Sequence, residues 1–163
     1  MKIVAFTGKS NSGKTTLIEK IIKILSSDYS IGVIKHDPKN KAQIDTEGKD
    51  SYKFFQAGAD VVLASPSKTT MIFQDVLDMD FLYRVFFDKD YVFIEGLKEL
   101  EFPRICVARD EIEEEYLSYS DAFALDKDTK NISILPVGVC VFDVNDTQGI
   151  IGWIDKNARK IDG

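Results

Sequence analysis

The sequence predicts an α/β fold in which helices cover a mostly parallel sheet. Apolar runs typical of strands alternate with segments of helical periodicity along the 163 residues. A Gly/Ser-rich loop joins the first strand to the first helix, and four scattered prolines mark no linker or domain boundary. Strands that alternate with helices form right-handed crossovers, which place a mostly parallel sheet between two helical layers. We therefore expect one three-layer domain over residues 1–163.

The individual elements follow from local patterns. The first strand is expected at 2–7, a run of β-forming apolar residues, and the first helix at 14–26, where apolar residues recur at helical spacing. A helix over 50–57 begins at Asp50, which suits an N-cap, and ends before Gly58. Further strands are expected at 30–35, 60–64 (buried), 69–73, 91–94, 103–108, 122–124 and 134–136. Further helices are expected at 76–87 and 147–160.

Composition excludes several classes of protein. With 21 basic and 27 acidic residues the net charge is −6, which argues against broad electrostatic binding to nucleic acid or to an anionic membrane. No run approaches the ~20 apolar residues of a membrane-spanning helix, and the N-terminus lacks a signal-peptide pattern, so we expect a cytoplasmic protein. Cys106 and Cys140 lie in apolar runs without metal-site or disulfide spacing, and we expect both to be buried reduced thiols.

The loop after the first strand has the pattern of a phosphate-binding loop. Residues 8–15 read GKSNSGKT, a full match to G-x-x-x-x-G-K-[ST] between a strand and a helix. Such a loop surrounds a phosphate chain with backbone N–H groups at a helix N-terminus, where the dipole favours anions. A lysine at position 14 would reach the β- and γ-phosphates, and a threonine hydroxyl at position 15 would bind Mg²⁺. The expected nucleotide-binding residues are Gly8, Lys9, Ser10, Asn11, Ser12, Gly13, Lys14, Thr15 and Thr16, with Lys14 also catalytic.

Ligands of such sheets bind at the carboxyl ends of strands, so the residues after positions 7, 35 and 94 are candidates for chemistry. Glu95 follows an apolar strand and precedes a glycine, and we expect it to be a catalytic carboxylate and, with Thr15, a Mg²⁺ ligand.

Two further residues follow the strand at 30–35. Asp37 is a candidate catalytic carboxylate that orients the attacking water or contacts the magnesium shell. His36, the only histidine, has a structural interpretation beside a catalytic one. Asp90 begins its strand at the opposite edge of the sheet and is expected only to cap.

Four blocks of sequence together resemble a known family. They are GKSNSGKTTLIEKII at 8–22, GVIKHD at 32–37, IDTEGKDSYKFFQAGAD at 44–60 and VFIEGLKELEFPRICVAR at 92–109. In this order they are similar to the molybdopterin-guanine dinucleotide biosynthesis protein B (MobB) family of small P-loop GTPase-like adapters. The resemblance implies a P-loop nucleoside triphosphate hydrolase fold, a homodimer, and binding of GTP with Mg²⁺ and slow hydrolysis. It also implies molybdopterin as a bound ligand and the guanylyltransferase that attaches GMP to molybdopterin as partner.

The resemblance suggests roles for several lysines, and each of these roles has an alternative. Lys49, in a family-typical block, would contact a phosphate; the alternative is a solvated lysine before a helix that Asp50 caps. Residues 38–41 read PKNK where many members are richer in histidine, so this segment is either a basic lip with Lys35 or a solvated loop. Lys9 would neutralise charge across a dimer, or is simply solvated.

Other functions remain open at the sequence level. A small-molecule P-loop kinase commonly closes an arginine-bearing lid, and the four arginines here form no clustered pair. A GTPase for metallocentre maturation would need clustered Cys or His ligands, and one histidine and two separated cysteines argue against it. An adapter that binds nucleotide without needing hydrolysis cannot be separated from a slow GTPase by sequence. No N-K-x-D guanine motif is present, so the choice of GTP rests on the resemblance alone.

Overall fold

A computed structural model describes residues 1–75 and 78–161. Its contacts divide the chain into two compact units, one formed by residues 1–36 and 86–161 and the other by 37–85 apart from 76 and 77. The expectation of a single domain over 1–163 stays a prediction. Among the described residues, no helix has the length and apolar character needed to cross a membrane.

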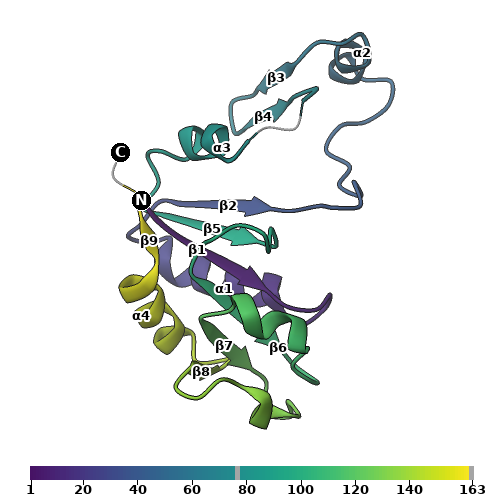
Figure 1. The fold of residues 1–163 in the computed structure, drawn as a ribbon. Helices are drawn as coiled ribbons and strands as arrows, with labels where there is room; N and C mark the ends of the chain where they lie inside the picture. Colours follow the sequence, from purple (N-terminus) through teal and green to yellow (C-terminus); the bar gives the residue numbers. More distant parts are fainter. Residues whose placement is uncertain (76–77, 162–163) are drawn as a thin grey trace. The chain divides into compact units, whose positions relative to one another are not determined.

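The first unit is built on a seven-stranded sheet. Strand β1 (Lys2–Thr7) lies at its centre, between β5 (Tyr91–Glu95) and β6 (Arg104–Ala108). Across the sheet the order is β2 (Ile31–Lys35), β5, β1, β6, β7 (Ala122–Leu125) and β8 (Cys140–Asp143), and all these pairs are parallel (Figure 1). The α/β fold with a mostly parallel sheet is therefore confirmed.

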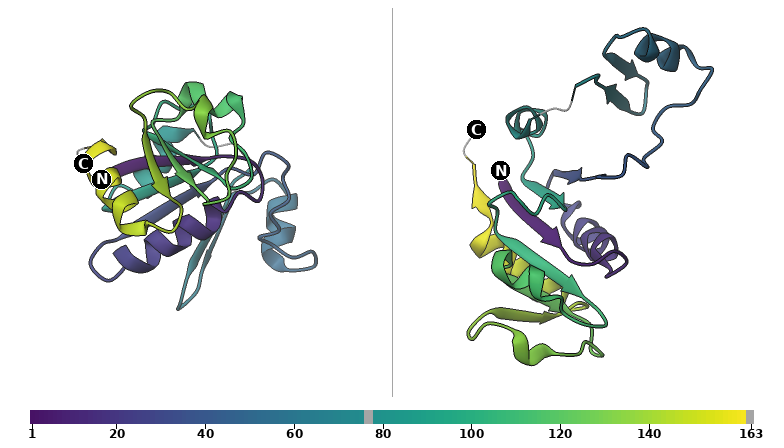
Figure 2. Two further views of the ribbon diagram at one scale, coloured as in Figure 1. Left: turned by 90° about the horizontal axis from the view of Figure 1, so that it is seen from below. Right: turned by 45° about the vertical axis from the view of Figure 1, so that its right-hand side comes forward.

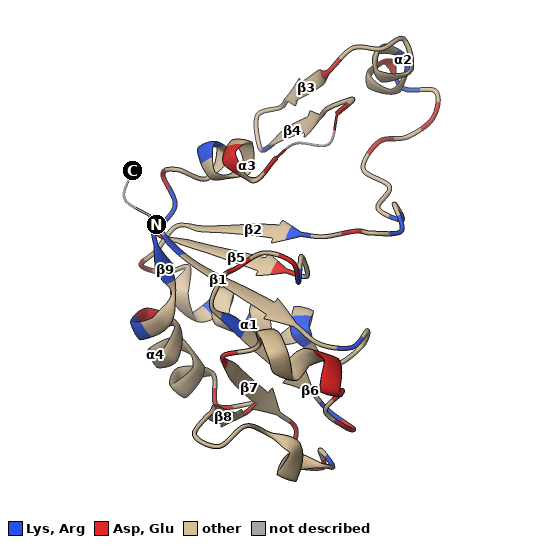
Figure 3. Ribbon diagram, viewed as in Figure 1, with Lys and Arg blue, Asp and Glu red and all other residues tan. Residues whose placement is uncertain are grey.

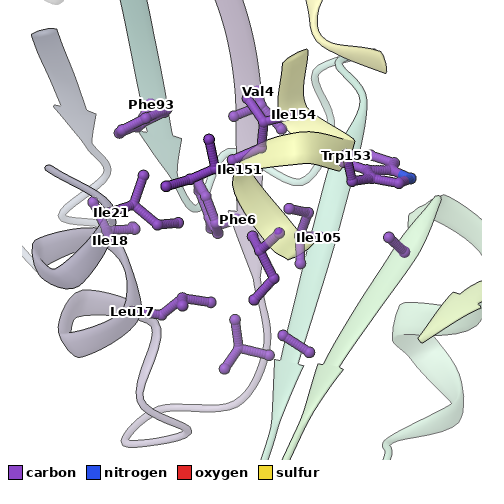
Figure 4. Close-up of a cluster of buried hydrophobic side chains, with 14 of the residues drawn as sticks. Val4, Phe6, Leu17, Ile18, Ile21, Phe93, Ile105, Ile151, Trp153 and Ile154 are labelled. Carbon is purple, nitrogen blue, oxygen red and sulfur yellow. The ribbon is translucent and has the colours of Figure 1, made fainter. Parts of the chain in front are cut away.

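Alternating residues of the strands form two buried faces. Val4 and Phe6 point to the face covered by α1 (Lys14–Leu25) and α4 (Thr147–Asn157), where Leu17, Ile21, Ile151 and Ile154 pack on them (Figure 4). The other face, around β6 and β7, is covered by the 3₁₀ turns Glu114–Tyr119 and Ile132–Ile134 and their flanking residues (Figure 2). The side-chain period of two thus lets helical segments cover both faces of one sheet.

The second unit holds a separate hairpin. Strands β3 (Val61–Ala64) and β4 (Thr69–Ile72) pair antiparallel with each other, next along the chain to α2 (Asp50–Gln56). The prediction of a buried strand over 60–64 is wrong, because only its first strand residue is buried. A four-residue connection that contains a proline returns the chain at once, so no crossover helix can form. Helix α3 (Met79–Val85) lies within the predicted helix 76–87, of which 76 and 77 fall outside the described residues.

Two predictions near the C-terminus are wrong. Residues 134–136 do not form a strand: they lie at the end of a 3₁₀ turn, and the strand is β8. Left-handed backbone at Asn131 and Gly138 turns the chain on both sides of 134–136. The last helix ends at Asn157, and Arg159–Lys160 form β9, antiparallel to the start of β1. This part of β1 is open to pairing because β6 joins β1 only at its last three residues.

The two cysteines have different environments. Cys106, in the central part of the sheet, is 1% exposed, and burial raises the pKa of its thiol to about 12. Cys140 is exposed, so the expectation that both thiols are buried is wrong for this residue. The reason is topological, since β8 is an edge strand with only β7 beside it.

Candidate functional site

The loop between β1 and α1 adopts a conformation that requires glycine at both ends. Gly8 has φ +131°, and a Cβ there would lie 2.2 Å from the carbonyl oxygen of Val107 in β6. Gly13 has φ +99° and is the N-cap of α1, without a side-chain cap. The loop therefore passes close to the neighbouring strand and presents the free N–H groups of the helix start.

Lys14 folds back over this loop. Its Nζ donates to the carbonyl oxygens of Gly8 at 2.8 Å and Lys9 at 2.7 Å. Burial lowers the pKa of Lys14, and the charge of Lys35 lowers it further, against the opposing effect of Glu95. A half-buried ammonium gains from a nearby anion, which is the arrangement expected of a phosphate-binding lysine.

Thr15 and Glu95 meet as the sequence predicts. The Thr15 hydroxyl donates to both carboxylate oxygens of Glu95, at 3.2 and 3.1 Å. Glu95 ends β5 opposite Phe6 of β1, and only 12% of its side chain is exposed. A hydroxyl and a carboxylate are oxygen ligands that suit Mg²⁺, which commonly uses one or two protein ligands together with phosphates and water. The described residues contain no group of three or more His, Cys, Asp or Glu that could hold a metal without such help.

These residues line one polar cavity of about 370 Å³. Lys35 and Arg109 also line it, and the Lys35 Nζ lies 2.7 Å from Oε1 of Glu95. Charged residues of both signs gather at the carboxyl ends of β1, β2 and β5 (Figure 3). The full lining is Ser10, Asn11, Gly13, Lys14, Thr15, Thr16, Lys35, Glu95 and Arg109.

Sequence reasoning missed Arg109 and placed Lys35 only in a basic lip. The signal for Arg109 is present, because it follows the expected strand 103–108 as Glu95 follows its own strand. What the sequence does not contain is the strand order, which places β6 directly beside β1. The carboxyl end of β6 is therefore part of the site.

The remaining loop residues have other surroundings. Lys9 forms an exposed ion pair with Glu113, at 3.1 Å. The Ser12 hydroxyl is buried and accepts or donates no hydrogen bond within the described residues. Residues 8–12 also line a smaller cavity of about 130 Å³ that extends to Tyr116.

Asp37 and Lys49 belong to the second unit. The Asp37 carboxylate accepts a hydrogen bond from the backbone N–H of Ala42 at 2.6 Å, and this bond holds the pKa of the carboxyl below its usual value. Lys49 is the N-cap position of α2, so the expectation that Asp50 caps this helix is wrong; Asp50 is its first residue. The roles of Asp37 in catalysis and of Lys49 in phosphate contact stay predictions.

Two other residues beside the sheet have structural contacts. The backbone N–H of His36 donates to the carbonyl of Glu95 at 3.0 Å and extends the pairing of β2 with β5. Asp90 accepts hydrogen bonds from the N–H and the hydroxyl of Ser30, each at 2.8 Å. The capping role expected of Asp90 is confirmed.

Comparison with known sequences identifies relatives. The family model described as "Molybdopterin guanine dinucleotide synthesis protein B" (MobB) matches residues 3–127. The molybdopterin-guanine dinucleotide biosynthesis adapter protein of Escherichia coli is 30% identical over 172 residues, covering 99% of this chain and 95% of that protein. The adapter protein of the same name from Haemophilus influenzae is 35% identical over 68% of this chain and 65% of its own length. A relative from Methanocaldococcus jannaschii is 38% identical, and the chain spans about half of its length (48%).

Solved structures of related proteins have the same fold. A crystal structure of molybdopterin-guanine biosynthesis protein B superposes with a TM-score of 0.72 at 28% identity, covering 94% of this chain and 98% of that one. The structure of Bacillus subtilis MobB gives a TM-score of 0.73 at 25% identity over 98% of this chain and all of that one. The fold is thus the three-layer P-loop nucleoside triphosphate hydrolase fold. From the match over residues 3–127, the nearly full-length relative in E. coli and this shared fold, the chain belongs to the MobB family.

Proposed function

We propose that this protein is a nucleotide-binding adapter of molybdopterin guanine dinucleotide synthesis, which binds GTP with Mg²⁺ and hydrolyses it slowly. The observation that carries the proposal is the contact of Thr15 with Glu95 in the cavity that Lys14 also lines. Membership of the family supplies the pathway, since its relatives are described as adapters of that synthesis.

Each residue has a defined task in this proposal. Free N–H groups of the loop and the N-terminus of α1 bind the phosphates, and Lys14 adds a positive charge within the loop. Thr15 and Glu95 would hold Mg²⁺, which would supply positive charge to stabilise the phosphates. Asp37 orients water for hydrolysis. Positioning and charge stabilisation are the main demands of phosphoryl transfer, and a site with few catalytic groups fits a slow enzyme.

The first experiment is a calorimetric titration of the protein with GTP, ATP and molybdopterin separately, each with Mg²⁺, followed by a phosphate-release assay. We expect GTP to bind more tightly than ATP, slow release of phosphate and a separate signal for molybdopterin. Lys14→Met should weaken GTP binding by about a hundredfold, because two charge-assisted contacts are lost. Lys23→Met, on the exposed side of α1, is the matched control and should bind normally.

Two outcomes would replace this proposal. Tight binding of ATP without a molybdopterin signal would favour a small-molecule kinase. A Glu95→Gln protein that binds nucleotide and still supports cofactor maturation would favour an adapter that needs no hydrolysis.

We further propose that the protein acts as a homodimer and that its partner is the guanylyltransferase that attaches GMP to molybdopterin. Support for the dimer comes from the hairpin, whose exposed apolar side chains Val62 and Met71 are register partners. Co-elution of the purified guanylyltransferase with this protein on gel filtration tests the partner. Separate elution in the presence of GTP and in its absence would reject it.

A further inference from the structure

Arg109 lies against the start of the first helix. It directly follows β6, the neighbour of β1, so the chain at this point runs beside the phosphate-binding loop. Its Nε and Nη2 atoms lie 3.0 Å from the point that a Cβ on Gly13 would occupy. Glycine at position 13 therefore has two effects. It permits the left-handed conformation of the N-cap, and it leaves room for the guanidinium of Arg109 against the loop.

The guanidinium of Arg109 differs from the others of this unit. Arg104 donates to the carbonyls of Gly96, Leu97 and Leu100, and Arg159 donates to a carbonyl as well. Within residues 1–75 and 78–161, the side chain of Arg109 has neither a hydrogen-bond acceptor nor a carboxylate partner, although acidic residues follow it directly in sequence. It lines both cavities beside the loop. Its five N–H donors, in a planar fork, match the geometry of a phosphate.

The two sides of the loop differ in the residues that they present, and this difference orients a bound nucleotide. Thr15 and Glu95, which would hold Mg²⁺, meet on the β5 side of β1. A metal held there would lie near the terminal phosphates, so we expect the β- and γ-phosphates on this side. The order β5, β1, β6 places Arg109, which follows β6, on the other side of β1 from Glu95. We expect the α-phosphate and the nucleoside on this second side.

We propose that Arg109 binds the α-phosphate of the nucleotide and so holds the nucleoside end of the ligand. This inference rests on the proposed nucleotide binding and adds a residue to it. Arg109 follows β6 and Glu95 ends β5, on opposite sides of β1, so we expect the contribution of Arg109 not to depend on the γ-phosphate or on Mg²⁺. Its contact is to phosphate and not to a base, so it acts alike on guanine and adenine nucleotides.

The test compares Arg109→Gln, Arg109→Lys and wild type by calorimetric titration with GTP and GDP, with Mg²⁺ and with EDTA. We expect Arg109→Gln to bind GTP and GDP about tenfold more weakly, by the same factor in all conditions. Arg109→Lys should recover part of the loss, because it keeps the charge without the fork. The unfolding temperature should not change, since Arg109 is exposed. Lys156→Gln, an exposed charge on α4, is the matched control.

Each other outcome overturns the inference in a distinguishable way. Wild-type affinity of Arg109→Gln for both nucleotides would show that the guanidinium makes no contact. Loss of GTP binding with normal GDP binding, or a loss seen only with Mg²⁺, would place it at the γ-phosphate. If wild-type protein binds neither nucleotide, the proposed function fails, and the inference fails with it.

Discussion

The carboxylate of Glu95 contacts two other residues of the site. It is mostly shielded from water, accepts from the Thr15 hydroxyl and forms an ion pair with Lys35. An ammonium and a metal ion compete for the same carboxylate oxygens. Lys35 holds Glu95 in position in this structure, and it would become free to contact a phosphate if Mg²⁺ took its place on the carboxylate.

The metal role of this pair is tested by a double-mutant cycle. Thr15→Val and Glu95→Gln should each remove most of the gain in GTP affinity that Mg²⁺ gives, because each removes one oxygen ligand. The double variant should lose little more, since both act through one metal. The measurement is titration with GTP at several Mg²⁺ concentrations. Additive losses, or a normal magnesium effect in either single variant, would contradict the assignment.

The two thiols should react very differently. A pKa of about 12 leaves Cys106 with a negligible thiolate fraction at pH 8, and only the thiolate is the nucleophile. Cys140 is exposed. A thiol reagent at pH 8 should therefore modify one cysteine in the folded protein and two in denaturant. Cys140→Ser should leave none reactive while folded, and rapid modification of that variant would show that Cys106 is accessible.

At the scale of elements, the loop between β1 and α1 depends on its close approach to β6. A Cβ at Gly8 would overlap the Val107 carbonyl, a backbone atom that cannot move aside without shifting a central strand. Gly48 also has positive φ, but nothing lies within 4 Å of its Cβ position. A side chain at Gly8 would therefore suffer both steric overlap and backbone strain, whereas a side chain at Gly48 would suffer backbone strain alone.

Replacing each glycine by alanine makes this difference measurable. Gly8→Ala should lower the free energy of unfolding by about 2 kcal/mol or more and abolish nucleotide binding, because strain and overlap add. Gly48→Ala should cost about 1 kcal/mol, from the left-handed backbone alone. Urea unfolding followed by circular dichroism gives both values. Equal losses would mean that the sheet accommodates the additional methyl group.

For the whole molecule, the buried core is concentrated in one unit. In the part of the chain that the structure describes, the clusters around β1 and around β6 and β7 consist of residues from 1–36 and 86–161. The hairpin buries Val61 but exposes Val62 and Met71 on one face. A two-stranded hairpin is only marginally stable alone in water. A second copy of the chain would cover this face and supply the missing packing.

Dimer formation through the hairpin has a direct test. Val62→Asp with Met71→Lys should reduce the assembly to a monomer in sedimentation equilibrium, because the opposite charges stay paired across the strands while the apolar surface is lost. Ile44→Asp, another exposed apolar residue of the same unit, is the matched control and should leave the dimer intact. A dimer that survives the double change would remove the hairpin from the interface.

Many helices and strands of this structure are predicted by sequence patterns, because their formation depends on residues that are close together in the sequence. The strand at 2–7, the loop from Gly8 to Thr15 and the following helix are encoded by apolar spacing and glycine placement. Glu95 follows a run of apolar residues, a pattern that predicts a strand with a functional residue at its end. The contact of Thr15 with Glu95 agrees with this pattern, since Glu95 ends β5 and Thr15 lies in the first turn of α1, which the loop after the adjacent strand β1 begins.

Short-range patterns alone predict the α/β class, the glycine-rich loop and a carboxylate at the end of β5, because helical and strand periods and glycine conformations are properties of short segments. Three features became visible only in the folded chain: 61–64 and 69–72 form a separate hairpin, Arg159–Lys160 pair with β1, and Arg109 lies beside Gly13. Strand order and open edges arise from contacts between residues far apart in the chain. The sequence of neither contacting segment has a periodic pattern that reveals such a contact.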